Sequence, residues 1–153
     1  MEAGIGIFII SCMSLLSPFY GVDDKGQLHG CAPSPNCLSS GSWQYNYLHH
    51  IEPIAYKYDS SEAYNRIANY FHNSENIHID EEIPGKYLRV TYFTKVLRFP
   101  DRVEVFFPDD KKQIEVRSHS WIGFWDVFAN RIRLNDFKKI IESETPPSSE
   151  TLF

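Results

Sequence analysis

Four runs of alternating apolar and polar residues lie between residues 77 and 117, with short turns between them. The longest run, residues 87–99, is bounded by Pro84-Gly85 and by Pro100-Asp101. Alternation with a period of two is typical of a β-strand with one buried face, and short turns between such runs favour antiparallel pairing. This part of the chain therefore predicts an antiparallel sheet of about four strands.

Two amphipathic segments flank the predicted strands. Residues 60–74 carry Ala63, Ile67 and Phe71 at a spacing of four, which is typical of one helical face. Residues 136–143 are a shorter candidate helix. Because a helix buries its apolar stripe against one face of a sheet, we predict an α+β fold with one helix before the sheet and one after it.

The segment before the first predicted helix has no clear periodicity. Residues 21–58 are rich in Gly, Ser, Pro and Asn and carry scattered aromatic residues, so we expect a long irregular segment draped on the domain. If this segment leaves the second face of the sheet uncovered, an apolar cleft or a partner-binding face is expected there.

The two ends of the chain differ from its middle. Residues 3–20 contain no charged side chain and many apolar ones, as in the apolar part of a signal peptide or in a membrane anchor. A buried N-terminal helix or strand is the alternative. We expect residues 1–20 to direct export or membrane attachment, residues 21–143 to form a single domain, and residues 144–153, which are polar with two prolines, to be a disordered tail.

Composition excludes several classes of protein. Hydrophobic residues make up 42% and charged residues 23% of the chain, values close to those of ordinary globular proteins. The chain has 15 Lys and Arg against 20 Asp and Glu, a net charge of −5, which argues against a general nucleic-acid-binding protein because such proteins need a basic face. It has no P-loop, dinucleotide-binding glycine motif or His-Glu-x-x-His pattern, and we expect no cofactor.

Two cysteines, Cys31 and Cys37, bracket a short loop that contains two prolines. A disulfide needs Cα atoms about 4.4–6.8 Å apart, which this loop permits, and an oxidising compartment would favour it. Packed free thiols are the alternative. A metal site is less favoured because two thiolates at this spacing have no evident second pair of ligands.

The residues best suited to chemistry lie between Arg117 and Arg133. From Lys111 to Lys139 the chain has seven cationic and three acidic residues, a local net charge of +4. The planar donor groups of arginine suit carboxylates and phosphates, so we predict a ligand- or partner-binding surface here. Its candidate residues are Arg117, Ser118, Ser120, Trp125, Asp126, Asn130, Arg131 and Arg133. The alternative is a structural role in which Asp126 pairs with Arg131 or Arg133.

The cysteine loop and this arginine-rich stretch together resemble the opening and closing motifs of a family of unknown function, DUF1499. The matching positions are Cys31-Ala-Pro-Ser-Pro-Asn36-Cys37, Arg117-Ser-His-Ser, Gly123, Asp126 and Asn130-Arg131-Ile-Arg133. The resemblance covers residues 28–142 and implies no reaction. Since many members carry an N-terminal export or membrane segment, it implies a bacterial envelope or periplasm, or a plastid or thylakoid in a plastid-bearing organism.

We therefore expect an exported or membrane-tethered accessory domain that is not catalytic. Aromatic residues beside arginines are common binding anchors, which suggests a membrane-associated protein complex, or an amphipathic or anionic ligand, as its partner. The alternative is an enzyme that acts on an anionic substrate, with Asp126 or Glu104 as general base and Arg117 and Arg131 as clamps. Convergence of these side chains in a pocket would favour the enzyme, whereas mutual pairing under the sheet would favour a structural role.

Overall fold

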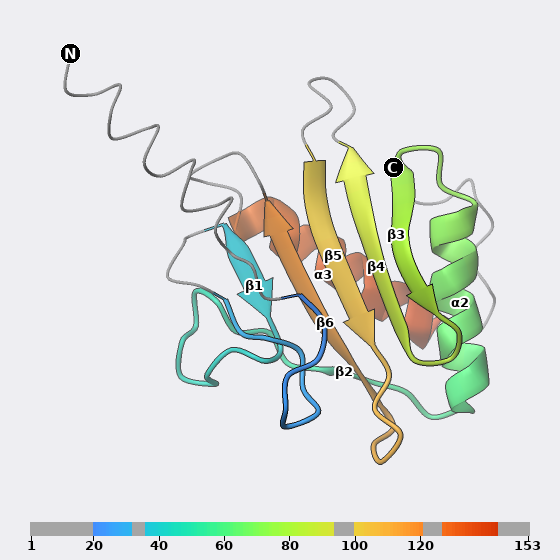
Figure 1. Cartoon of the computed structure of the whole chain (residues 1–153), viewed down its shortest axis with the longest axis horizontal. Helices are drawn as coiled ribbons and strands as arrows, with labels where there is room; N and C mark the ends of the chain where they lie inside the picture. The colour runs from blue at the N-terminus through green and yellow to red at the C-terminus, as the bar shows by residue number, and fades with distance from the viewer. Residues whose placement is uncertain (1–19, 32–35, 94–99, 121–126, 144–153) are drawn as a thin grey trace.

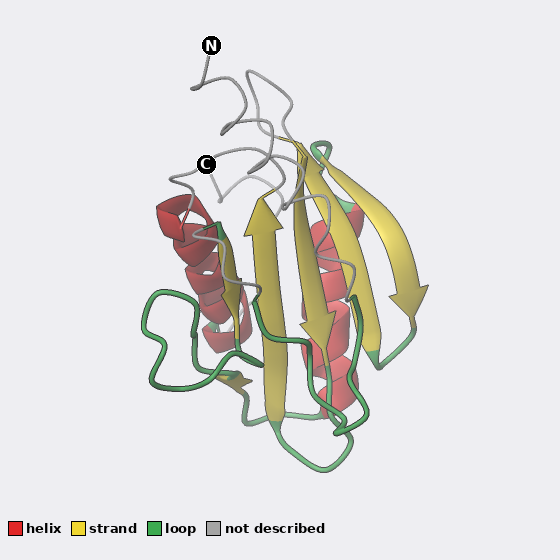
Figure 2. Ribbon diagram, turned by 60° about the vertical axis from the view of Figure 1, so that its left-hand side comes forward, coloured by secondary structure: helices red, strands yellow, loops and turns green. Residues whose placement is uncertain are grey.

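The structure, a computed structural model, describes residues 20–31, 36–93, 100–120 and 127–143. Their elements are β1 (Cys37–Ser39), β2 (Ile54–Ala55), α2 (Ser60–His72), β3 (Ile77–Ile83), β4 (Tyr87–Phe93), β5 (Pro100–Phe106), β6 (Gln113–Ser120) and α3 (Val127–Glu142). The strands form one antiparallel sheet in the order β1-β6-β5-β4-β3, and β2 also pairs with β6. Both helices pack on the same face of this sheet (Figures 1 and 2). The predicted α+β fold is confirmed.

Strands β1 and β2 lie within residues 21–58, which we expected to be irregular. They contain only three and two residues, too few for an alternating pattern to be visible. Both nevertheless pair with β6, and their residues Leu38 and Ile54 are buried in the core. These two strands therefore bring the sheet from the expected four strands to six.

Helix α3 begins at Val127, not near residue 136 as predicted. Its buried stripe consists of Asn130, Leu134, Phe137, Ile140 and Ile141 at helical spacing. Because a polar asparagine occupies the first position of this stripe, a search for apolar periodicity misses the first turns of the helix. The end of the strand predicted over residues 87–99, the expected leader except Tyr20, and the expected tail lie outside the described residues.

The main core lies between the sheet and the two helices. Phe71 of α2 meets Tyr92 of β4 and Phe137 of α3 edge to face, with ring centroids 6.2 and 5.5 Å apart. Such aromatic pairs stabilise a core beyond the area they bury. Among the described residues, no helix has the length and hydropathy needed to cross a bilayer.

The other face of the sheet, which we call the open face, is partly covered by residues 20–31, the strap (Figure 1). The backbone N–H of Gly21 donates to Glu104 Oε1 at 2.6 Å, and that of Leu28 donates to Glu115 Oε2 at 2.8 Å. The Leu28 side chain packs on Tyr87 and Phe106 in a second, small core cluster. The strap therefore docks on the sheet through two buried or half-buried carboxylates and one apolar anchor.

A disulfide joins the end of the strap to the start of β1. Cys31 and Cys37 are bonded, with their Cα atoms 5.6 Å apart. A cross-link across so short a loop stabilises the fold by about 2 kcal/mol in the loop-entropy description. The expected disulfide is thus present, and it fixes the strap to the edge of the sheet.

Gly41 provides a test of how the strap is held. A Cβ atom at this position would lie 1.8 Å from the carbonyl oxygen of Leu28 and 2.8 Å from its carbonyl carbon. Because both atoms belong to the backbone, Gly41→Ala must displace the strap. We expect about tenfold faster hydrogen exchange at the Gly21 and Leu28 amides, and a loss of about 2 kcal/mol in the free energy of unfolding.

The matched control for this experiment is Gln44→Ala, since the Gln44 side chain is exposed nearby in the same part of the chain. It should leave both amides protected. Unchanged exchange in Gly41→Ala would contradict the close approach of the two backbones.

Candidate functional site

Three of the predicted site residues meet in one buried hydrogen-bond network between β6 and α3. Ser118 Oγ donates to Asn130 Oδ1 at 2.6 Å, and Asn130 Nδ2 donates to Ser120 Oγ at 3.2 Å. Asn130 Nδ2 also donates to the carbonyl oxygen of Asn36 at 3.0 Å, so the stretch after Arg117 does meet the cysteine loop. Ser118, Ser120 and Asn130 have no exposed surface, so these groups are occupied by one another inside the protein.

Arg133 extends this network toward the neighbouring strand. Its Nη1 donates to Ser118 Oγ at 3.0 Å, and its Nη2 pairs with Asp101 Oδ2 at 2.6 Å. Its guanidinium also lies 4.8 Å from the ring centroid of Tyr92. Arg133 is therefore neutralised by Asp101 of β5, while Asp126, the partner we considered, and Trp125 lie outside the described residues.

The two remaining arginines lie on different sides of the sheet. Arg131, on the helical side, donates from Nη2 to the carbonyl oxygen of Tyr47 at 3.3 Å. Arg117, on the open face, pairs through Nη1 with Glu104 Oε2 at 2.8 Å, and both side chains are at most 3% exposed. Glu104 and Arg117 of the enzyme alternative thus meet, but Arg131 does not join them.

Glu104 is the centre of the polar contacts on the open face. Besides Arg117 and the Gly21 N–H, it accepts a hydrogen bond from the Tyr87 hydroxyl at 2.7 Å. Burial, reinforced by the nearby Glu104 carboxylate, raises the pKa of Tyr87 far above its usual value. Tyr87 is therefore a fixed hydrogen-bond donor at neutral pH, and Glu104 is occupied by three groups from three parts of the chain.

Three arginines surround the ring of Tyr20 at the start of the strap. The guanidinium carbons of Arg102, Arg89 and Arg117 lie 4.6, 5.3 and 5.9 Å from its centroid. Cations this close to an aromatic face are attracted to it, most strongly where water is excluded. Tyr20 therefore adds an aromatic contact to the two carboxylate contacts that hold the strap.

His119 lies two residues after Arg117 on β6 and is buried on the same face. Burial, followed by the charges of Arg117 and Arg102, lowers the pKa of His119 to about 4. Its Nδ1 has no hydrogen-bond partner among the described residues. At neutral pH this imidazole is therefore uncharged, as its position between arginines requires.

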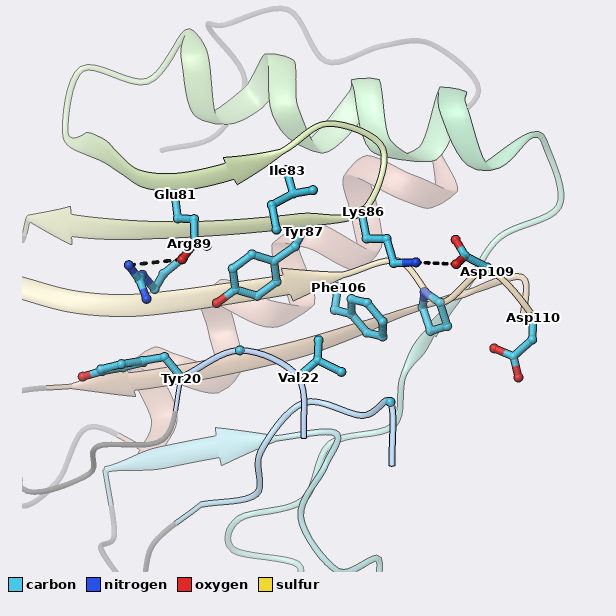
Figure 3. Close-up of a pocket in the computed structure, with 13 residues that line it drawn as sticks. Tyr20, Val22, Glu81, Ile83, Lys86, Tyr87, Arg89, Phe106, Asp109 and Asp110 are labelled. Atoms are coloured by element: carbon cyan, nitrogen blue, oxygen red, sulfur yellow. Dashed lines mark hydrogen bonds and ion pairs between the residues drawn. The ribbon is translucent and has the colours of Figure 1, made fainter. Parts of the chain in front are cut away.

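A groove of about 720 Å³ lies between the strap and the adjacent ends of β3, β4 and β5 (Figure 3). Its lining residues are Tyr20, Gly21, Val22, Gly26, Glu81, Ile83, Lys86, Tyr87, Arg89, Phe106, Pro108, Asp109 and Asp110. The rings of Tyr87 and Phe106 lie at its centre, with Val22 on the strap side and Ile83 on the β3 side. Both aliphatic side chains are partly exposed, so the middle of the groove is apolar and accessible.

Charged pairs lie at the two ends of this groove. Arg89 Nη2 pairs with Glu81 Oε2 at 3.3 Å at one end, and Lys86 pairs with Asp109 at the other (Figure 3). The lining carries two cations and three carboxylates in total, so it has little net charge. An apolar middle with ionic ends suits an elongated amphipathic molecule. In the described part of the chain, no three His, Cys, Asp or Glu side chains gather as metal ligands.

None of the residues that line the groove was among the predicted site residues. One signal for the groove was available in the sequence. Tyr87 and Arg89 alternate with core residues on the long strand and so lie on its second face, where we expected an apolar cleft if that face stayed uncovered. Val22 and Phe106 belong to no sequence motif. An apolar residue in a loop or a strand gives the same sequence pattern whether it lines a groove or packs in a core. The groove is assembled by tertiary structure alone.

Asn130 tests whether the buried network stabilises the fold. Asn130→Ala removes the hydrogen-bond partner of Ser118 and Ser120 in a fully buried site, and unmet buried groups are costly. We expect the free energy of unfolding in urea to fall by about 3 kcal/mol. Asn135→Ala, at an exposed position of the same helix, should change it by less than about 0.5 kcal/mol. Equal effects of the two substitutions would contradict a structural role.

His119 gives the fold a specific pH dependence. Its pKa is about 4 in the folded protein, against 6.5 for an unperturbed imidazole such as that of an unfolded chain, so the unfolded state binds the extra proton first as pH falls. Stability is unaffected by this group above pH 6.5 and falls between pH 6.5 and 4, by about 3 kcal/mol in total. His119→Gln should remove this part of the decline in urea unfolding followed from neutral to acid pH. Parallel curves for the two proteins would count against a buried neutral imidazole.

Comparison with known proteins identifies the family to which the chain belongs. The family model described as "Protein of unknown function (DUF1499)" matches residues 27–141. Comparisons with curated proteins and with solved structures give no significant match. The matched span includes the disulfide, all six strands, α2 and nearly all of α3. The chain therefore belongs to the DUF1499 family.

Proposed function

We propose that this chain is a non-catalytic accessory domain, exported or tethered to a membrane, that binds an amphipathic ligand in the groove on its open face. The groove itself carries the proposal. It combines an accessible apolar middle with ion pairs at both ends, and large apolar pockets with a few placed polar groups are the usual form of a small-molecule site.

The charge of the groove favours an amphipathic ligand over a purely anionic one. Lys86 and Arg89 are each paired with a carboxylate, and Asp110 adds a further acidic group. A simple anion would have to compete with these carboxylates, whereas an acyl or aryl chain gains from the apolar middle. A zwitterionic or hydrogen-bonding head group matches the paired charges at either end.

Binding is better supported than catalysis on the open face. Glu104, the base considered for an enzyme, is at most 3% exposed and accepts hydrogen bonds from Arg117, Tyr87 and Gly21. A general base must reach the proton that it removes, and a carboxylate surrounded in this way serves to hold the strap. Its role here is to shape the groove wall.

An extracytoplasmic or membrane-linked setting is supported by two further features. Residues 3–20 are uncharged and mostly apolar, and the Cys31–Cys37 disulfide fits an oxidising compartment. In such a setting, a membrane-associated protein or complex is the partner that we propose delivers or receives the ligand.

Ile83 tests the groove directly. Ile83→Glu places a charge beside the apolar middle of the groove, where it must lose water when an acyl chain enters. With dodecylphosphocholine below its critical micelle concentration as the probe, isothermal titration calorimetry should show binding to the wild type and at least about tenfold weaker binding to the variant.

The matched control is Ile132→Glu, which makes the same change at an exposed site on α3 outside the groove lining. It should bind the probe as the wild type does. Absence of binding to the wild type, or equal binding by both variants, would overturn the groove as the ligand site.

A further inference from the structure

Exposed apolar side chains are concentrated in one short loop that the groove does not include. Seven large apolar residues are exposed in the described part of the chain, and four of them lie within residues 43–48, the aromatic loop. These are Trp43, Tyr45, Tyr47 and Leu48, which are 72%, 60%, 80% and 67% exposed. The rings of Trp43 and Tyr45 are in contact, with centroids 5.2 Å apart. Exposed apolar side chains gathered in this way cost solvation free energy and usually mark an interaction site.

The backbone of the aromatic loop is ordered by its own hydrogen bonds. The N–H of Asn46 donates to the carbonyl oxygen of Trp43 at 2.8 Å, and the N–H groups of His49 and His50 donate to that of Asn46 at 2.9 and 2.8 Å. Arg131 donates to the carbonyl oxygen of Tyr47 at 3.3 Å. Several backbone polar groups are thus already paired, which lowers the cost of moving the loop out of water.

The stretch of sequence that contains the loop is uncharged to an unusual degree. No Asp, Glu, Lys or Arg occurs between Lys25 and Glu52, a stretch of 26 residues. The loop follows β1 and projects from the edge of the sheet, away from the strands (Figures 1 and 2). Its side chains can therefore meet a broad surface with few charged side chains from the same stretch beside them.

We infer that the aromatic loop is a docking site for the interface of a lipid bilayer. Trp and Tyr have an apolar ring with a polar tip and prefer the boundary between head groups and acyl chains, and Leu48 adds a purely apolar contact. The stretch contains no fixed cation of its own and Arg131, which contacts it, is a single charge, so attraction to anionic lipid is not the main driving force. This site is separate from the groove and does not rest on the function proposed for it.

The inference predicts binding to zwitterionic membranes through Trp43. Full-length protein is mixed with phosphatidylcholine vesicles whose acyl chains are brominated, which quench tryptophans that enter the bilayer. The Trp43 signal is the difference between wild type and Trp43→Phe. We expect this signal to be quenched, to remain so at high salt, and not to increase when phosphatidylglycerol is added.

A second measurement uses the exposed side chains, whose replacement does not disturb the core. The triple variant Trp43→Ser, Tyr47→Ser, Leu48→Ser should partition into the same vesicles at least about tenfold more weakly than wild type. Ile83→Glu, which alters the groove, should partition as the wild type does. Since residues 3–20 are the same in all three proteins, any binding through them does not affect the comparison.

Three results would overturn the inference. The first is vesicle binding without quenching of Trp43, and the second is no vesicle binding at all. The third is self-association in analytical ultracentrifugation that the triple variant abolishes while vesicle partition is unchanged, because this would assign the loop to an interface between copies of the chain. Failure of dodecylphosphocholine binding would concern only the groove.

Discussion

The buried carboxylate of Glu104 organises the open face of this protein. A charge removed from water must be matched by an opposite charge and by hydrogen bonds, and here Arg117, Tyr87 and the backbone of Gly21 provide them. Two of these partners belong to neighbouring strands, and the third belongs to the strap. The same interaction that neutralises the carboxylate therefore fixes a wall of the groove, and without it the strap would lose its anchor at Gly21.

Strand β6 explains why the closing motif looks so rich in chemistry. Because alternate side chains of a strand point to opposite faces, Arg117 and His119 face the strap while Ser118 and Ser120 face α3. Both faces are covered, so all four polar residues are buried, and buried polar groups are normally hydrogen-bonded within the protein. The contacts of Arg117, Ser118 and Ser120 hold the two layers to the sheet.

Most of the fold was predictable because it depends on patterns within single segments. Alternation identified β3 to β6, and a four-residue spacing identified α2. The missed parts had no such pattern: β2 has two residues, and the first turn of the buried stripe of α3 contains Asn130, whose partners lie on β6. Polar residues that replace apolar ones in a core can be recognised only when their hydrogen-bond partners are known.

The candidate site was less predictable, for a related reason. The groove combines Val22, Ile83 and Phe106 from three separate segments, and an apolar residue gives no sign in sequence of facing a core or a groove. The aromatic residues of the loop were visible from the start, yet their exposure was not. The polar motif near the carboxyl end instead suggested Arg117 and Asn130 as site residues, and both are buried in the structure.

The central place of β6 also limits how this family can vary in length. A residue inserted or deleted before Arg117 in Gln113–Ser120, if no bulge absorbs it, would exchange the two sets of side chains, so that arginine and histidine would face α3 and the serines would face the strap. Both layers would lose their partners at once. Homologous chains should therefore keep this strand free of insertions and deletions and accommodate changes of length in the exposed turn at residues 109–112 instead.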